Sequence, residues 1–105
     1  MTNNTSPKTL IIGLDGASPY PIYRLAERDI MPTVRVLMQE GLAQKLRSTI
    51  PPVTCPAWVS SYTGVNIGKH GIPDFFLSID LRRKKITFAD STKRKVKAFW
   101  KLRPQ

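Results

Sequence analysis

The chain has 105 residues, a length that suits one small domain, and its hydrophobic fraction of 41% is compatible with a globular core. It carries 17 Lys and Arg residues against 7 Asp and Glu residues, and ten of the cations lie in residues 82–105, so the formal net charge of +10 belongs mainly to that tail. A single cysteine, Cys55, excludes an internal disulfide.

The N-terminus of the sequence shows no apolar segment that would act as a secretory signal. Residues 1–8 are polar and are predicted to form a disordered tail, which leaves residues 9–105 for the folded part. No apolar run approaches the roughly 20 residues needed to span a bilayer. The sequence therefore predicts a cytoplasmic protein without a membrane partner.

The first third of the sequence predicts one strand and little regular helix. Residues 9–14 form a short apolar run that ends in Asp-Gly, which is typical of a buried, parallel-type strand. Residues 17–23 contain two prolines, so a regular helix throughout this stretch is not expected. A helical turn is expected over residues 24–28.

The middle of the sequence predicts two helices on either side of a second strand. Pro32 near a first turn, an apolar face and a final Gly41 indicate a helix. The loose alternation of residues 42–50 favours a strand that runs into a Pro-Pro loop. Thr54 near the N-cap and Pro56 near the first helical position then predict a helix over residues 57–62 that ends at Thr63-Gly64.

The last part of the sequence predicts a strand pair and a final helix. Residues 66–73 read as a Gly-rich loop, residues 75–79 and 86–89 as two strands, and residues 96–102 as a short amphipathic helix. This order is the opening of an α/β fold. Only about two core strands are predicted, which is few for a stable sheet with helices on both faces.

Asp15 and Thr54 are the candidate functional residues. Ligands of α/β sheets bind beyond the carboxyl ends of the strands, where the carboxylate of Asp15 would be a hard ligand for Zn²⁺, Mn²⁺ or Mg²⁺. A hydroxyl at a helix N-terminus, such as that of Thr54, could be an activated nucleophile close to a bound phosphate. The alternatives are that Asp15 only forms a turn and that Thr54 is only an N-cap.

Two further residues are predicted to be structural. His70 is the single histidine of the chain and lies in the Gly-rich loop. Cys55 has no nearby base, so a small buried residue is favoured over a nucleophile.

The ordered set of these motifs resembles the type I phosphodiesterase/nucleotide pyrophosphatase family of the alkaline phosphatase superfamily, over roughly residues 9–77. No single motif is specific, but their order and spacing are. The motifs are Ile11-Ile12-Gly13-Leu14-Asp15-Gly16, Met31-Pro32-Thr33, Pro51-Pro52-Val53-Thr54-Cys55-Pro56-Ala57-Trp58, Thr63-Gly64 and His70-Gly71-Ile72.

The resemblance implies an α/β fold that is the N-terminal fragment of an alkaline-phosphatase-like three-layer sandwich. It implies that Asp15 is a ligand of one of two divalent metal ions, usually zinc, with manganese or magnesium as alternatives. Thr54 would coordinate the same ion, attack phosphorus and form a phosphothreonine that water hydrolyses. The implied substrate is a phosphoester or a nucleotide-like small molecule.

The sequence departs from the family in two places. Nucleotide pyrophosphatases commonly carry an Asn three residues after the nucleophile, where this chain has Ala57. The family's remaining metal ligands lie beyond a stretch of this length. We therefore expect a C-terminal portion to be missing, whether the chain is a fragment of a longer protein, the product of a truncated gene or one piece of a split one. We also expect the chain to be inactive alone.

Two other functions remain as alternatives. The basic runs at residues 82–85 and 93–97 could contact nucleic acid, with Phe99 and Trp100 available for stacking. A solvated basic surface is favoured over that reading, so a nucleic-acid partner is not expected. The chain could also be a non-catalytic remnant whose incomplete sheet makes it prone to aggregate.

Overall fold

The computed structural model describes residues 8–102, so most of the predicted disordered tail, residues 1–7, lies outside the described residues. The chain divides into an N-terminal unit, Met1–Lys45, and a C-terminal unit, Leu46–Gln105. Within residues 8–102 the secondary structure consists of four α-helices, one 3₁₀ turn and a two-stranded antiparallel sheet. The chain is therefore a small mixed α/β structure. None of the described helices has the length and apolar character needed to cross a membrane.

The N-terminal unit contains two helices, α1 (Pro19–Glu27) and α2 (Pro32–Glu40), which pack on each other. The sequence predicted that residues 17–23 would not be helical throughout and placed only a helical turn at residues 24–28. Residues 17 and 18 are indeed outside α1, but the helix begins at Pro19 and is longer than that turn. Pro19 and Pro21 occupy the first turn of α1, where backbone N–H groups have no helical acceptor, so the missing donors cost nothing. The helix that was predicted to begin near Pro32 and end at Gly41 is confirmed.

Neither strand predicted for the first half of the chain is present. Residues 9–14 and 42–50 are irregular segments, and their large apolar side chains are exposed, for example Leu10 at 83%. A strand is stabilised by the hydrogen-bonding ladder to a neighbour, and neither segment has one among residues 8–102. Neither the apolar run of residues 9–14 nor the alternation of residues 42–50 was therefore enough to produce a strand.

The C-terminal unit is built around α3 (Thr54–Thr63). This helix begins earlier than the predicted residue 57, because Val53 is its N-cap and Thr54 its first helical residue. It ends at Gly64, as predicted, since Gly64 takes a left-handed conformation (φ +71°) that suits glycine. The Ile50–Pro51 peptide bond in the loop before α3 is cis.

A short helix, α4 (Ile67–His70), replaces the loop predicted for residues 66–73. The side chain of Asn66 caps it by accepting a hydrogen bond from the backbone N–H of Lys69 at 3.2 Å. The backbone N–H of Lys95 donates to the carbonyl of His70 at 3.1 Å. This bond joins the later part of the chain to α4.

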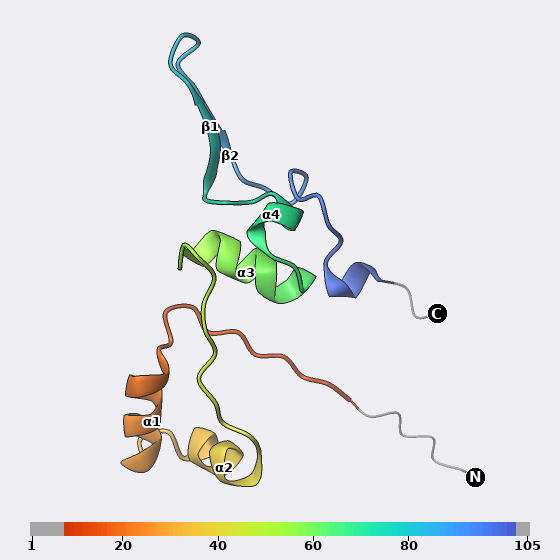
Figure 1. Cartoon of the computed structure of the whole chain (residues 1–105). Helices are drawn as coiled ribbons and strands as arrows, with labels where there is room; N and C mark the ends of the chain where they lie inside the picture. The colour runs from red at the N-terminus through yellow and green to blue at the C-terminus, as the bar shows by residue number, and fades with distance from the viewer. Residues whose placement is uncertain (1–7, 103–105) are drawn as a thin grey trace, which may run out of the picture. The chain divides into compact units, whose positions relative to one another are not determined.

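The predicted strand pair is confirmed as an antiparallel hairpin of β1 (Phe76–Asp80) and β2 (Lys85–Phe88), which runs as an arm away from α3 and α4 (Figure 1). The helix predicted over residues 96–102 is reduced to a 3₁₀ turn, Phe99–Lys101. Its bonds run from Lys101 to Ala98 and from Leu102 to Phe99, and Ala98 is fully buried.

Candidate functional site

Asp15 lies in the N-terminal unit, in an exposed turn formed with Gly16. Gly16 has φ +68°, and its carbonyl accepts a hydrogen bond from the N–H of Ser18 at 3.1 Å. A positive φ is a conformation that glycine adopts without steric cost, so the Asp-Gly pair favours this turn. Asp15 therefore directly follows an apolar segment, as predicted, but that segment is not a strand.

The residue before Asp15 lines a hollow in the N-terminal unit. This hollow has a volume of about 360 Å³ and is lined mainly by apolar side chains of α1, α2 and the segments on either side of them. Its lining residues are Ile12, Leu14, Ala17, Pro19, Ile22, Tyr23, Met31, Val34 and Gln44. Asp15 is not among them, so its carboxylate does not line this hollow.

Thr54 lies in the C-terminal unit as the first residue of α3. The first bond across the start of this helix runs from the N–H of Ala57 to the carbonyl of Val53 at 3.1 Å. The N-cap, Val53, has no side-chain acceptor, and Pro56 has no N–H. The backbone N–H groups of Thr54 and Cys55 are therefore left without helical partners, which makes this end of α3 favourable for an anion.

The hydroxyl of Thr54 is not used in capping α3. Thr54 is exposed, and its side chain makes no hydrogen bond within residues 46–102. The reading of Thr54 as a plain N-cap is thus not what the structure shows, because Val53 occupies that position. A free hydroxyl beside unpaired N–H groups lies where an anion would bind, but it is a weak nucleophile until a metal ion or a base activates it.

The described residues do not form a complete metal centre. Asp15 and Thr54 offer two oxygen ligands, but they belong to different units. Among residues 8–102, no three His, Cys, Asp or Glu side chains come together in a group that could hold an ion. A catalytic zinc site normally takes three protein ligands, so this donor set does not fit one by itself.

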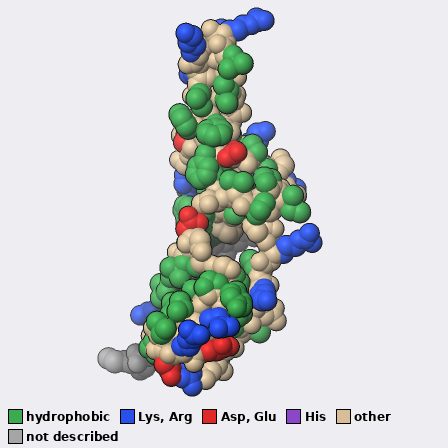
Figure 2. All heavy atoms as spheres, turned by 90° about the vertical axis from the view of Figure 1, so that its left-hand side faces the viewer, with side chains coloured by type: hydrophobic (Ala, Val, Ile, Leu, Met, Phe, Trp, Pro, Cys, Tyr) green, Lys and Arg blue, Asp and Glu red, His purple; other side chains and the backbone are tan. Residues whose placement is uncertain are grey.

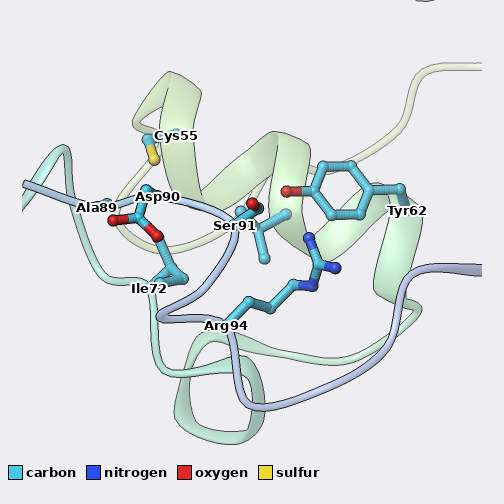
Figure 3. A pocket seen from close by; sticks show the side chains of 8 residues that line it. Cys55, Tyr62, Ile72, Ala89, Asp90, Ser91 and Arg94 are labelled. Carbon is cyan, nitrogen blue, oxygen red and sulfur yellow. The ribbon is translucent and has the colours of Figure 1, made fainter.

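A second feature of the C-terminal unit is a cavity of about 170 Å³ beside α3 (Figure 3). Cys55, Val59 and Tyr62 line it from α3, with Arg94 and the segment Ala89–Ser91 on the other side. Sequence reasoning missed this cavity, because its lining comes from α3, from Ile72 and from residues 89–94, which are far apart in the chain. Thr54 is not among its lining residues, so the cavity is separate from the candidate nucleophile.

Charged groups of the cavity are held by local contacts. The guanidinium of Arg94 lies over the ring of Tyr62, 5.4 Å from its centre, and its Nε donates to the carbonyl of Val96 at 2.7 Å. Hydrogen bonds from the hydroxyl and the backbone N–H of Thr92 lower the pKa of Asp90. Burial, and then the charge of Asp74, raise the pKa of the Cys55 thiol, which leaves it a poor nucleophile.

His70 is structural, in agreement with the sequence interpretation. It is fully buried, and its Nδ1 accepts from the N–H of Ile72 at 3.2 Å. Because Nδ1 is an acceptor, the proton is on Nε2, which then donates to the hydroxyl of Ser60 on α3 at 3.0 Å. Burial lowers the pKa of His70, so the neutral ring is the stable form. This ring fixes α4 against the middle of α3.

Comparison with known families now assigns the chain. The family model described as type I phosphodiesterase / nucleotide pyrophosphatase matches residues 9–104. The chain belongs to this family. The match covers both units, including Asp15 and Thr54, and extends past residue 77, where the resemblance seen in the sequence ends. No curated protein and no solved structure matches the chain. The family is one of phosphoester hydrolases.

Proposed function

We propose that the chain is the nucleophile-bearing, N-terminal portion of a metal-dependent phosphoester hydrolase with Thr54 as the nucleophile. The exposed, unbonded hydroxyl of Thr54 at the uncapped start of α3 carries this proposal. The unpaired N–H groups of Thr54 and Cys55 would attract the phosphoryl oxygens and stabilise the negative charge that grows on them. Membership of the family supplies the class of substrate, a phosphoester or a nucleotide-like small molecule.

Asp15 is proposed as a ligand of one of the family's two divalent ions, with zinc favoured over manganese and magnesium. It is an exposed carboxylate in a turn that leaves its oxygens free for a hard cation. Residues 8–102 contain no group of three ligands, so further side chains outside this chain would complete the centre. For the same reason we expect no turnover from residues 1–105 alone.

The architecture proposed for the complete enzyme is the three-layer sandwich of the alkaline phosphatase superfamily, in the cytoplasm. The exposed apolar side chains of residues 9–14 and 42–50 support it, because a sheet with further strands would give both segments partners and cover. In that sheet Asp15 would follow the carboxyl end of a central strand.

A nucleic-acid-binding function is not favoured. The ring of Trp100 lies 5.0 Å from that of Tyr62 and 5.0 Å from that of Phe99. These aromatic contacts compete with the stacking on bases that single-stranded nucleic acid would require.

The deciding experiment is hydrolysis of p-nitrophenyl phosphate and bis-p-nitrophenyl phosphate by a form of the chain extended through the downstream coding region, with Zn²⁺ or Mn²⁺. We expect activity in the extended form that Thr54→Ala abolishes. Ser61→Ala, which removes an exposed hydroxyl from the same helix, is the matched control and should keep full activity. Equal activity of Thr54→Ala and Ser61→Ala would refute the assignment of the nucleophile.

A further inference from the structure

The hairpin of β1 and β2 carries an apolar face that no other described part of its unit covers. Phe76 pairs with Phe88 and Ile79 with Ile86 across the two strands, and a register shift between residues 76 and 78 puts both pairs on one face. All four side chains are exposed, by 47% to 61%. The rings of Phe76 and Phe88 also meet edge to face, 6.3 Å apart.

The far end of the same hairpin is cationic and has an exposed leucine. The turn joining the strands, residues 81–84, begins with Leu81, whose side chain is 83% exposed. It is followed by four consecutive cations, Arg82-Arg83-Lys84-Lys85. Figure 2 shows Lys and Arg side chains at this end of the unit and apolar side chains along the arm below it.

The backbone of this turn is held by a carboxylate. The carboxylate of Asp80 accepts hydrogen bonds from the backbone N–H groups of Arg82 and Arg83, both at 3.0 Å. Asp80 therefore holds the backbone of the turn, and its one ionic contact is a long one of 3.9 Å to Arg83. Four cations against one carboxylate leave the end of the hairpin strongly positive.

We propose that this hairpin tip, residues 79–86, docks the protein on an anionic lipid surface. Lipid head groups provide phosphate charge directly above an apolar layer, so they match a tip that has both cations and exposed aliphatic side chains. The cations contact the head groups while Leu81 and Ile79 enter the boundary with the acyl chains. The docking is peripheral and is independent of the proposed hydrolase activity.

Charge and apolarity together distinguish this partner from three others. A nucleic acid would pair with the cations but leave Leu81 in water, because an aliphatic side chain in the turn offers no flat surface for a base. A second copy of this chain is disfavoured, since its own tip carries the same positive charge. An acidic protein without an apolar patch would likewise leave the side chain of Leu81 exposed to water.

Co-sedimentation with lipid vesicles tests the proposal directly on the 105-residue chain. Vesicles of phosphatidylcholine alone are compared with vesicles holding about 30 mol% phosphatidylglycerol, at about 150 mM salt. We expect binding only to the anionic vesicles. The double variant Arg82→Gln/Lys84→Gln should weaken the partition coefficient about 25-fold, at roughly fivefold per cation. Leu81→Ser should weaken it about fivefold.

The matched control is Lys97→Gln/Lys101→Gln, which removes the same charge from exposed positions outside the hairpin. It should change the partition coefficient less than about fivefold. Equal losses in the two double variants would show adsorption by net charge alone and overturn the proposal. Full binding of Leu81→Ser, or tighter binding to a DNA duplex than to the vesicles, would overturn it in favour of a purely ionic partner.

Discussion

Replacing His70 with alanine should severely destabilise the C-terminal unit. The ring is fully buried and bonds the backbone N–H of Ile72 and the hydroxyl of Ser60. Removing the ring leaves a cavity and leaves both groups without this hydrogen-bond partner. The N–H of Ile72 belongs to a buried residue. An unsatisfied buried polar group costs about 1–3 kcal/mol, and a large-to-small core substitution costs about 2–5 kcal/mol. These penalties overlap, so we expect a loss of about 3–5 kcal/mol.

Urea unfolding followed by tryptophan fluorescence measures this loss. Both tryptophans of the chain, Trp58 and Trp100, lie in the C-terminal unit, so the emission reports on that unit. A small domain is stable by only about 5–15 kcal/mol, so the midpoint should fall steeply. Lys69→Ala, an exposed neighbour on α4, is the control and should cost less than about 0.5 kcal/mol.

A loss of less than about 1 kcal/mol in the free energy of unfolding of His70→Ala would contradict this role, because one buried polar group without a partner already costs about that much. A double-mutant cycle with Ser60→Ala isolates the bond between the two side chains. We expect a coupling free energy of about 1 kcal/mol, since both groups are neutral.

Three further predictions concern stability. Because burial lowers the pKa of His70, the unfolded chain binds the proton of this ring more readily than the folded chain does. The free energy of unfolding should therefore be constant above about pH 6.5 and fall by up to ~1.4 kcal/mol per pH unit below it. Urea midpoints should show this slope for the wild type but not for His70→Asn. Gly64→Ala should lower the free energy of unfolding by about 1–2 kcal/mol, because φ at Gly64 is +71°, a conformation that strains alanine even though an added Cβ would meet no atom within 4 Å. An unchanged urea midpoint would contradict the left-handed cap. Lys84→Gly should stabilise the hairpin by about 1 kcal/mol, since Lys84 has φ +50°, which glycine adopts without steric cost. Hydrogen exchange of the amides bonded between β1 and β2 should then slow. Faster exchange would argue against this turn.

Local signals in the sequence predicted several elements correctly. The end of α3 followed from Gly64, and α2 followed from Pro32 and Gly41. The hairpin followed from two short β-prone runs around a polar turn. In each case the information lies within a few residues of the element, which is the range over which capping and turn preferences act.

The sequence failed where the outcome depends on residues far along the chain. Residues 9–14 and 42–50 have apolar patterns that suit strands, but a strand also requires a partner. The bond between Ser60 and His70 depends on the chain reversal between α3 and α4, and the contact of Arg94 with Tyr62 on the later return of the chain. No local pattern encodes either pair.

The candidate site shows the same division. The position of Thr54 at the start of a helix could be predicted from the prolines around it, although the N-cap is Val53. The prediction that Asp15 follows a strand is wrong, because the Asp-Gly turn forms from local preferences whereas a strand at residues 9–14 would need a partner strand. The order of motifs gave only a resemblance to the family, and the match of the family model over residues 9–104 assigns it.

The single thiol of the chain provides a natural reporter for the candidate site. Cys55 immediately follows Thr54, and its sulfur faces the cavity of about 170 Å³ beside α3. A trifluoroethyl group attached there at alkaline pH would place a fluorine nucleus one residue from the proposed nucleophile without any engineered cysteine. Its chemical shift would then report on repacking of α3 and on the phosphorylation that we propose at Thr54, in the same spectrum.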